Sequence, residues 1–390
     1  MRSKIKIATI IGTRPDVIKM APVIKALKKS SSFKPIVITT SQHRQMLDQM
    51  LRAFSISTDF DLNIMKKNQS LLDITTVVTK KLFNVFRRLR PDMVLVQGDT
   101  TTAFVSTLVA FYHRIKVGHV EAGLRTYDKY NPYPEEINRK LISSLADLHF
   151  APTKGAKNNL IRENIAKKNI YITGNTAIDA LMMAAAKNRK NKAGRSHIIS
   201  GFDTKRKRVI LVTAHRRESW GRPIRQICYA LKTIARRFPE VVIVYPVHLN
   251  PNVKKPVYKI LGNVSRIILV PPLSYERFIE YMSKCFLVLT DSGGLQEEAP
   301  SFDKPVLVMR KVTERPEVVR VGAAKVIGVG QSRIVSEVAR LLKSSRSYKK
   351  MAQAPNPFGD GKAAERITKI LLHYFDLTKR LPSEFKVGGG

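Results

Sequence analysis

The sequence predicts an α/β protein made of two doubly wound, Rossmann-like domains. The chain has 390 residues, enough for two domains of ordinary size, and 44% of them are apolar, which is typical of a globular protein. Short apolar segments that resemble buried parallel strands alternate with longer segments of helix formers. A polar, basic stretch over Lys187–Lys207 lacks apolar periodicity and indicates the connection between the domains.

The first domain is expected to begin with the strand Lys4–Ile11, where isoleucines alternate with lysines. A turn at Gly12 follows, and because proline is favoured in the first turn of a helix, a helix is predicted over Pro15–Lys28. Further strands are predicted at Pro35–Thr39, Met93–Gln97, Val117–Val120, Leu148–Ala151 and Ile170–Thr173. Helices are predicted over Gln42–Phe54, over Leu71–Arg88, through Ala110 after Asp99, and from Gly174–Thr176 onward.

The second domain is expected to start with the apolar strand Val209–Thr213. Its other strands are predicted at Val241–Tyr245, Arg266–Val270, Cys285–Leu289, Pro305–Met309 and Ala324–Val329. A helix is expected to begin at Thr313–Glu317, and further helices are expected over Ser332–Lys343 and Ala363–Tyr374. The predicted domains are 1–173 and 208–357, with a connecting helix and basic linker over 174–207 and a C-terminal helix over 358–387 that crosses back to the first domain.

The charge is strongly positive, with 69 Lys and Arg against 30 Asp and Glu, a formal net charge of +39. Such an excess attracts polyanions. The basic residues are dispersed, however, and no nucleic-acid motif accompanies them, so we predict a solvated basic surface with no specific nucleic-acid partner. The two cysteines, Cys228 and Cys285, lie in apolar segments and imply no disulfide framework. No apolar run reaches the ~20 residues of a membrane span, and we expect a cytoplasmic protein.

The stretch Thr290–Ala299 resembles a strand-to-helix joint with small residues at the turn. Gly293 and Gly294 let the backbone approach a ligand closely, and free N–H groups in a first helical turn attract anions. Ser292 can cap the helix or donate to a phosphate oxygen. The alternative is an ordinary turn in which Asp291 or Ser292 is the N-cap and nothing binds. This stretch alone leaves both interpretations open.

Three carboxylates follow strands of the first domain, namely Asp99, Glu121 and Glu135. Asp99 is expected to be the N-cap of its helix, and Glu135 and Glu136 suit the first turn of theirs. Because the carboxyl ends of parallel strands share one edge of a sheet, the three should converge there. Such convergence is costly unless a cation, a metal or proton chemistry uses it.

Cationic groups are predicted at the same kind of edge. Arg14 and Lys19 follow the first strand, and His215 follows the first strand of the second domain beside Arg216 and Arg217. A lone histidine after a strand is more often structural. Because His215 stands beside two arginines, contact of its side chain with an anion is an interpretation at least as strong. The sequence lacks a P-loop, HExxH, a metal-spaced Cys/His cluster and GxSxG, and the turn at Gly12 lacks GxGxxG. We therefore expect no metal and no redox cofactor.

Eight motifs together resemble those of the non-hydrolysing UDP-N-acetylglucosamine 2-epimerase family, in order, from about Lys4 to about Tyr374. They are GTRPD (Gly12–Asp16), GDTTT (Gly98–Thr102), HVEAGLRT (His119–Thr126), PEEINR (Pro134–Arg139), HRRES (His215–Ser219), YPVHLNPNV (Tyr245–Val253), TDSGGLQEEAP (Thr290–Pro300) and ERPE (Glu314–Glu317). The resemblance implies the GT-B architecture, with the active site in a cleft between two Rossmann-like domains. It also implies a homodimer that interconverts UDP-GlcNAc and UDP-ManNAc by eliminating UDP to 2-acetamidoglucal and adding it back.

The resemblance also implies a set of site residues. Asp99, Glu121 and Glu135 would be acid/base or ring-stabilising carboxylates, and His215 would act on the leaving diphosphate; which carboxylate is base and which is acid stays open. The nucleotide would be bound by Arg14, Lys19, Phe278, Ser292, Gly293, Gly294, Glu298 and Arg315. Relatives also carry an activating UDP-GlcNAc site, and the matching positions here are Gln42, Gln45, Glu135, Arg216 and His248.

Three other functions remain open from the sequence. A hydrolysing epimerase would release free ManNAc and UDP, and Glu121, Arg125 and Glu135 favour the non-hydrolysing branch by resemblance. A GT-B glycosyltransferase shares the fold but needs an acceptor, which no sequence feature identifies. A binding module would use the basic surface to hold nucleic acid or an anionic membrane.

Overall fold

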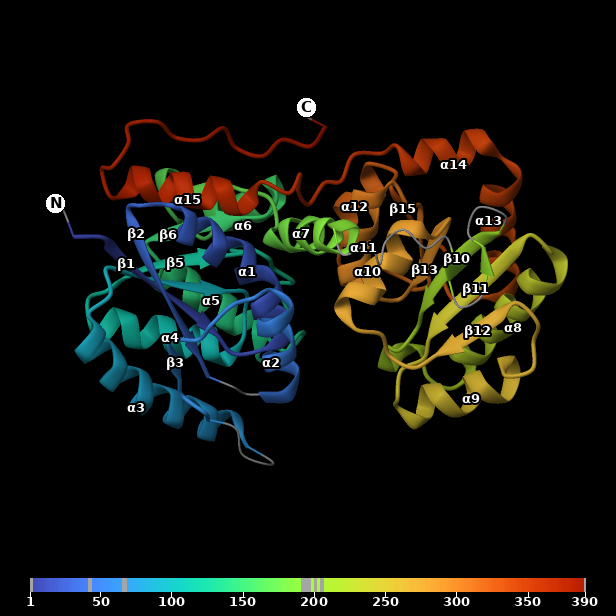
Figure 1. Cartoon of the computed structure of the whole chain (residues 1–390), viewed down its shortest axis with the longest axis horizontal. Coiled ribbons are helices and arrows are strands. Elements are labelled where there is room, and N and C mark those ends of the chain that lie inside the picture. Colours follow the sequence, from blue (N-terminus) through green and yellow to red (C-terminus); the bar gives the residue numbers. More distant parts are fainter. Residues whose placement is uncertain are drawn as a thin grey trace. The chain divides into compact units, whose positions relative to one another are not determined.

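The computed structural model describes residues 3–40, 44–64, 69–190, 198–199, 202–203 and 207–388. The chain divides into two compact units, which are considered separately below (Figure 1). Unit 1 contains the residues up to Ala180 together with the segment from Phe358 onward, and unit 2 contains Leu181–Pro357. No helix among the described residues is long and apolar enough to cross a lipid bilayer.

Unit 1 is built on a parallel sheet with the strand order β3-β2-β1-β4-β5-β6-β7. The order reverses direction between β1 and β4, the arrangement of a doubly wound fold, and ligands of such sheets bind beyond the carboxyl ends of the strands. The strands are β1 (Ile5–Ile11), β2 (Phe33–Thr39), β3 (Phe60–Asp61), β4 (Met93–Gln97), β5 (Lys116–Val120), β6 (Leu148–Ala151) and β7 (Ile170–Ile172).

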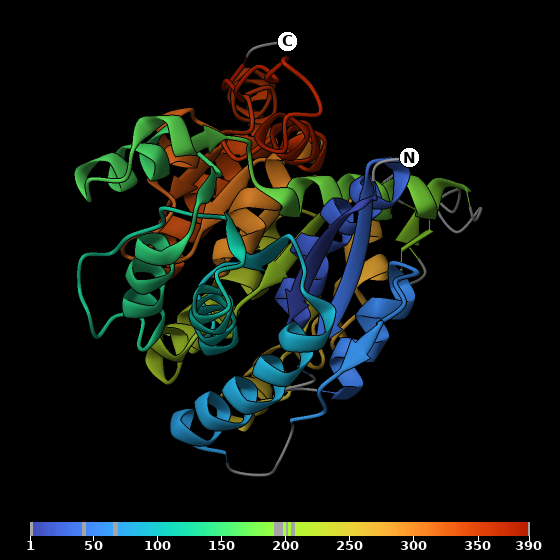
Figure 2. The same ribbon diagram turned by 90° about the vertical axis from the view of Figure 1, so that its left-hand side faces the viewer.

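The helices of unit 1 cover this sheet. Helix α4 (Thr101–Tyr112) lies between α3 (Leu71–Leu89) and α5 (Glu135–Leu145) (Figure 2). The apolar sides of these helices join Ala8, Ile10 and Val94 in one core. Helix α1 (Arg14–Lys29) packs beside α2 (Arg44–Ala53) and beside the C-terminal α15 (Ala363–Tyr374). The remaining helices are α6 (Lys154–Arg162) and the short η1 (Lys167–Asn169).

Unit 2 repeats the design with the parallel order β12-β11-β10-β13-β14-β15. The strands are β10 (Arg208–Thr213), β11 (Val241–Pro246), β12 (Ile267–Val270), β13 (Leu287–Thr290), β14 (Val306–Val308) and β15 (Ala324–Val326). The helical elements are η3 (Arg217–Ser219), α8 (Arg222–Arg237), α9 (Pro251–Leu261), α10 (Tyr275–Lys284), α11 (Gly293–Glu298), η4 (Ala299–Phe302), α12 (Pro316–Arg320), α13 (Gln331–Lys343) and α14 (Ser345–Ala352).

The α/β fold with two doubly wound sheets is confirmed, and several elements differ from the sequence-based expectation. The division between the units falls inside α7 (Thr176–Lys190), which continues into the stretch expected to be a linker. The two-residue pair β8 (Ile198–Ile199) and β9 (Phe202–Asp203) also lies in that stretch. The short β3 and helices α6, α8, α9, α10 and α14 were not predicted.

Candidate active site

Glu121 is the centre of the polar cluster in unit 1. It follows β5 with φ of 64° and is 7% exposed, although a non-glycine residue in the left-handed region is uncommon. Lys19 of α1 places Nζ 2.7 Å from Oε1 and 2.5 Å from Oε2. Gln97 at the end of β4 donates to Oε2, and Asn175 donates to Oε1 at 3.0 Å. Donors from three separate segments therefore hold one buried carboxylate in place.

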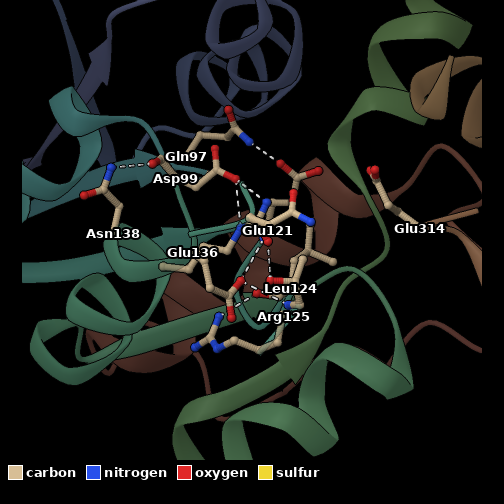
Figure 3. Close-up of polar contacts among 12 residues, drawn as sticks. Gln97, Asp99, Glu121, Leu124, Arg125, Glu136, Asn138 and Glu314 are labelled. Carbon is tan, nitrogen blue, oxygen red and sulfur yellow. Dashed lines mark hydrogen bonds and ion pairs between the residues drawn. The ribbon is translucent and has the colours of Figure 1, made fainter. Parts of the chain in front are cut away.

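Asp99 lies in the neighbouring turn, after β4 (Figure 3). Its Oδ2 is 2.8 Å from Nε and 2.6 Å from Nη2 of Arg139, a residue of α5. The expectation that Asp99 caps α4 is wrong, because Thr100 is the N-cap and its hydroxyl accepts from Ala103 N at 3.1 Å. Capping by Thr100 leaves the Asp99 carboxylate available to the arginine.

The adjacent acids Glu135 and Glu136 have different surroundings. Glu136 is fully buried and accepts from Thr126 N and Tyr127 N, each at 3.0 Å. These bonds and Arg139 keep the pKa of Glu136 below its ordinary value against the opposing effect of burial. Glu135 is half-buried, and its Oε2 is buried without a hydrogen-bond partner among the residues described. Glu136 therefore anchors a loop, whereas Glu135 keeps an acceptor for a ligand or a proton.

This difference gives a matched pair of variants. We expect Glu136→Gln to lower the free energy of unfolding by about 1–3 kcal/mol, because its amide N–H₂ would face a backbone N–H. Glu135→Gln should change that free energy by less than about 0.5 kcal/mol, yet lower turnover about 10²-fold or more. Urea unfolding and turnover of both variants check the assignment. Equal stabilities, or the reversed order, would contradict it.

Arg125 has a structural role in unit 1. Its fully buried side chain makes two bonds to Glu163, with Nε at 2.7 Å from Oε1 and Nη2 at 2.6 Å from Oε2. The guanidinium also donates to Leu124 O and Ser143 Oγ. All of these partners belong to the protein, so Arg125 fixes the turn after Glu121 rather than facing a ligand.

Arg14 and Lys19 both belong to α1, but their surroundings differ. Asp16 accepts from Gly12 N and Thr13 N, each at 2.9 Å, and so fixes the start of the helix. Burial raises the pKa of Asp16 to about 6. Arg14 is the first helical residue and is half-buried, whereas Lys19 is held by Glu121 as described above.

In unit 2, Asp291 connects the loop after β10 to the turn after β13. This fully buried carboxylate accepts from His215 N at 2.7 Å, Arg216 N at 2.9 Å and Ser219 Oγ at 3.0 Å. Its Oδ1 lies 3.4 Å from Nδ1 of His215. Tyr245 also holds this loop, since its hydroxyl donates a hydrogen bond to Ala214 O at 2.8 Å. The backbone at His215 is therefore fixed from two strands.

His215 is 42% exposed and stacks on His248, with ring centroids 5.6 Å apart and an interplanar angle of 17°. Partial burial lowers the pKa of His215, and the neighbouring His248 and Arg216 act in the same direction, while Asp291 opposes them. The imidazole is therefore neutral near pH 7. Its Nδ1 faces Asp291 and the opposite edge of the ring is open to solvent, where it can contact a ligand.

Arg216 lies beside the glycine turn at the start of α11. A Cβ added to Gly293 would lie 3.6 Å from Nη2 of Arg216, and Nη1 is 3.4 Å from Glu314. Arg310, 7% exposed after β14, has Nε 2.5 Å from Glu218 and Nη2 3.3 Å from Glu314. The two arginines hold the pKa of Glu314 below its usual value despite partial burial. Two guanidinium groups and a glycine backbone together suit an anion at this edge.

The other predicted ligands of unit 2 lie on nearby elements. Arg315, the N-cap of α12, directs Nε to the carboxylate of the buried Glu297. Ser292 is the N-cap of α11 without a side-chain capping bond, and its N–H donates to Thr290 Oγ1 at 2.8 Å. Gly294 is exposed, Glu298 is half-buried at the end of α11, and Phe278 is half-buried in α10.

Five positions match the activating site, and apart from Glu135, which is placed above, they are only partly described. Gln42 lies outside the described residues, and Gln45 belongs to α2 but its side chain is likewise outside them. Arg216 and His248 lie beside Gly293 and His215 respectively. No cluster of three or more metal-ligating His, Cys, Asp or Glu side chains occurs within the described part of the chain.

Several site residues were missed in the sequence. Gln97, Asn175 and Arg139 bind the two carboxylates of unit 1, and Asp291 and Arg310 organise unit 2. A polar residue ending an apolar strand was the available signal for Gln97. Arg139 follows Glu135 by one helical turn, a spacing that places both on one side of α5.

Parallel doubly wound sheets with polar side chains at the carboxyl ends of their strands define a two-domain α/β protein of the GT-B class. The chain belongs to the UDP-N-acetylglucosamine 2-epimerase family, whose model matches residues 25–372. The resemblance of the motifs to those of UDP-N-acetylglucosamine 2-epimerases is therefore confirmed.

Three relatives illustrate the similarity. A UDP-N-acetylglucosamine 2-epimerase of Escherichia coli strain K12 is 51% identical over 368 residues, covering 94% of this chain and 98% of that protein. One of Bacillus subtilis strain 168 is 49% identical over 385 residues, covering 98% and 99%. The crystal structure of the Neisseria meningitidis UDP-GlcNAc 2-epimerase bound to UDP-GlcNAc has a TM-score of 0.85 and 47% identity, covering 94% of this chain and all of that one.

Proposed function

We propose that the protein interconverts UDP-GlcNAc and UDP-ManNAc by inverting the configuration at C2 of the sugar, without releasing free sugar. Family membership supports the substrate and the reaction type. One observation carries the chemistry: a buried carboxylate, Glu121, is held by Lys19, Gln97 and Asn175 in the turn next to that of Asp99. The product would supply ManNAc units for cell-surface polysaccharide.

The proposed reaction removes the C2 proton while the C1–O bond to UDP breaks, giving 2-acetamidoglucal and UDP. The C2 hydrogen is barely acidic in the substrate, but it acidifies as C1 gains oxocarbenium character. UDP then adds back to C1 as a proton returns to the opposite face of C2. Two faces require two proton-transfer groups. Asp99, Glu121 and Glu135 are the proposed acid, base and ring-stabilising groups.

The diphosphate must stay bound between the two steps, since otherwise the glucal escapes. We assign this task to unit 2, where Arg216, Gly293 and neutral His215 offer a cation, a backbone amide and an imidazole. Ser292, Gly294 and Arg315 would complete the phosphate contacts, and Arg14 and Lys19 of unit 1 are further proposed ligands. Phe278 would lie at the uracil and Glu298 at the ribose hydroxyls.

Product analysis separates this function from its rivals. Incubation with UDP-GlcNAc alone should give UDP-ManNAc and an equilibrium mixture that is also reached from UDP-ManNAc. Free ManNAc with stoichiometric UDP as the main products would identify the hydrolysing reaction. Consumption of UDP-GlcNAc only after addition of an acceptor would identify a glycosyltransferase.

We further propose a homodimer. Large apolar side chains are exposed along α3, α4 and α5, which lie next to one another in unit 1: Leu72, Phe83, Phe111, Tyr112, Ile137 and Leu141. Such a face is typical of a protein contact. Sedimentation should give twice the chain mass of 44.0 kDa.

Two further proposals concern regulation and compartment. Activation by a second UDP-GlcNAc is proposed by family resemblance, with Gln42, Gln45, Glu135, Arg216 and His248 as its ligands. The cysteines Cys228 and Cys285 are free and buried, which suits a cytoplasmic location with reduced thiols.

A further inference from the structure

His119 is a buried histidine that the proposed reaction does not use. It is the penultimate residue of β5, fully buried, and it comes two residues before Glu121. Its Nε2 lies 2.8 Å from the carbonyl oxygen of Gly98. A carbonyl only accepts, so Nε2 carries the proton and donates. The imidazole of β5 is thereby attached to the residue that precedes Asp99.

Gly98 is held on both sides by the end of β5. Its N–H donates to Val120 O at 3.0 Å, while its carbonyl accepts from His119. Glu121 has φ of 64°, which is uncommon for a non-glycine residue, whereas Gly98 has φ of 68°, which glycine adopts readily. A Cβ added to Gly98 would lie 3.6 Å from Oε2 of Glu121. Hydrogen bonds therefore join the turn that carries Asp99 to the end of β5, directly before Glu121.

We propose that His119 is a positioning residue for proton transfer: its Nε2–H bond to Gly98 sets the position of the Asp99 turn relative to the carboxylate of Glu121. The proposal depends on the function proposed above. His119 does not touch the reacting atoms, so losing its hydrogen bond should displace the carboxylates without removing either one. A displacement of about 1 Å costs on the order of 10²-fold in rate.

The surroundings of His119 keep the ring neutral. Its register partner on β6 is His149, and the nearby charged groups are Arg125 and Arg139, all of which oppose a positive charge. Burial is the largest effect and lowers the pKa of His119 to about 3. Nδ1 has no hydrogen-bond partner among the described residues. One tautomer therefore donates to Gly98 across the range in which the enzyme would work.

Two substitutions at this position separate positioning from packing. Glutamine places an amide N–H₂ at about the reach of Nε2, whereas phenylalanine keeps the ring volume and removes the donor. His149 supplies the control, since it is equally buried on the adjacent strand and bonds to the backbone of Ala146 rather than to Gly98. His149→Gln and His149→Phe therefore change the same core without touching the Gly98 turn.

The experiment measures kcat, KM and the urea unfolding midpoint of wild type and the four variants with UDP-GlcNAc. We expect His119→Phe to lower kcat about 10- to 100-fold with KM changed less than about threefold, and His119→Gln to restore kcat to within about threefold. Both His149 variants should keep wild-type kcat within about twofold, even where their unfolding midpoints fall.

The proposal is overturned if His119→Phe keeps wild-type kcat, if His119→Gln is as slow as His119→Phe, or if His149→Phe is equally slow. If His119→Phe does not fold, the proposal is tested by kcat of His119→Gln and by ¹⁵N NMR of the wild-type imidazoles. A persistent Nε2–H tautomer from pH 5 to 8 with near-normal kcat in His119→Gln supports the proposal. The other tautomer, titration in that range, or a slow His119→Gln overturns it. Wild type without epimerase activity would instead refute the proposed function.

Discussion

Glu121→Gln is expected to lower kcat for epimerisation by about 10²–10⁴-fold, the scale of a lost acid–base group. Glutamine keeps the shape of the side chain but cannot take up or return a proton. It also removes the ion pair with Lys19, whose Nζ lies 2.5 Å from Oε2. Initial rates of UDP-ManNAc formation measure the effect.

Binding provides the control for this variant. If unit 2 holds the diphosphate, the Kd of Glu121→Gln for UDP should stay within about threefold of the wild-type value. Gln97→Glu is the matched comparison, because it adds a second carboxylate beside Glu121 and should weaken the reaction without removing the group itself. A Glu121→Gln enzyme with near wild-type kcat would remove Glu121 from the chemistry.

His215→Ala is the second large effect we expect, a loss of about 10²-fold or more in kcat. The backbone N–H of residue 215 still donates to Asp291, so the loop should keep its position and only the imidazole is lost. His248→Phe is the control, since it preserves the ring stack at 5.6 Å and should lower kcat less than His215→Ala.

The pH dependence gives a second test of His215. Because burial lowers the pKa of this imidazole, its acid limb in kcat should lie below pH 6.5, the ordinary histidine value, with activity retained above that limb. The limb should disappear from the residual activity of His215→Ala. An unchanged limb, or a kcat near that of wild type, would show that His215 does not take part.

The sequence alone predicted which segments would bring functional groups to the sheet edges. Buried parallel strands are nearly continuous apolar runs, and the polar residues that follow them must lie at the carboxyl edge of their own sheet. Asp99 and Glu121 do so in unit 1, and His215 does so in unit 2. Two-residue β3 was missed because so short a strand carries no periodicity.

Which of these groups contact one another could not be predicted from the sequence. Lys19 and Glu121 are separated by 102 residues, and Asp99 and Arg139 by 40, so their contacts depend on strand order and helix packing. The N-cap error at Asp99 has a local cause: Thr100, one residue later, is also a favourable capping residue. In the structure Thr100 caps the helix and Asp99 pairs with Arg139. Asp291 shows the same ambiguity: either Asp291 or Ser292 could have capped α11, and in the structure Ser292 is the N-cap while Asp291 fixes the His215 loop.

The central claim is that the carboxylates of unit 1 remove and return the C2 hydrogen of a UDP-sugar. A ¹H NMR time course with UDP-GlcNAc in D₂O tests it most directly. We predict that wild type places deuterium at C2 as UDP-ManNAc forms, with no free ManNAc accumulating, and that Glu121→Gln slows exchange and epimerisation together. Formation of UDP-ManNAc with protium retained at C2 in all product would contradict the account.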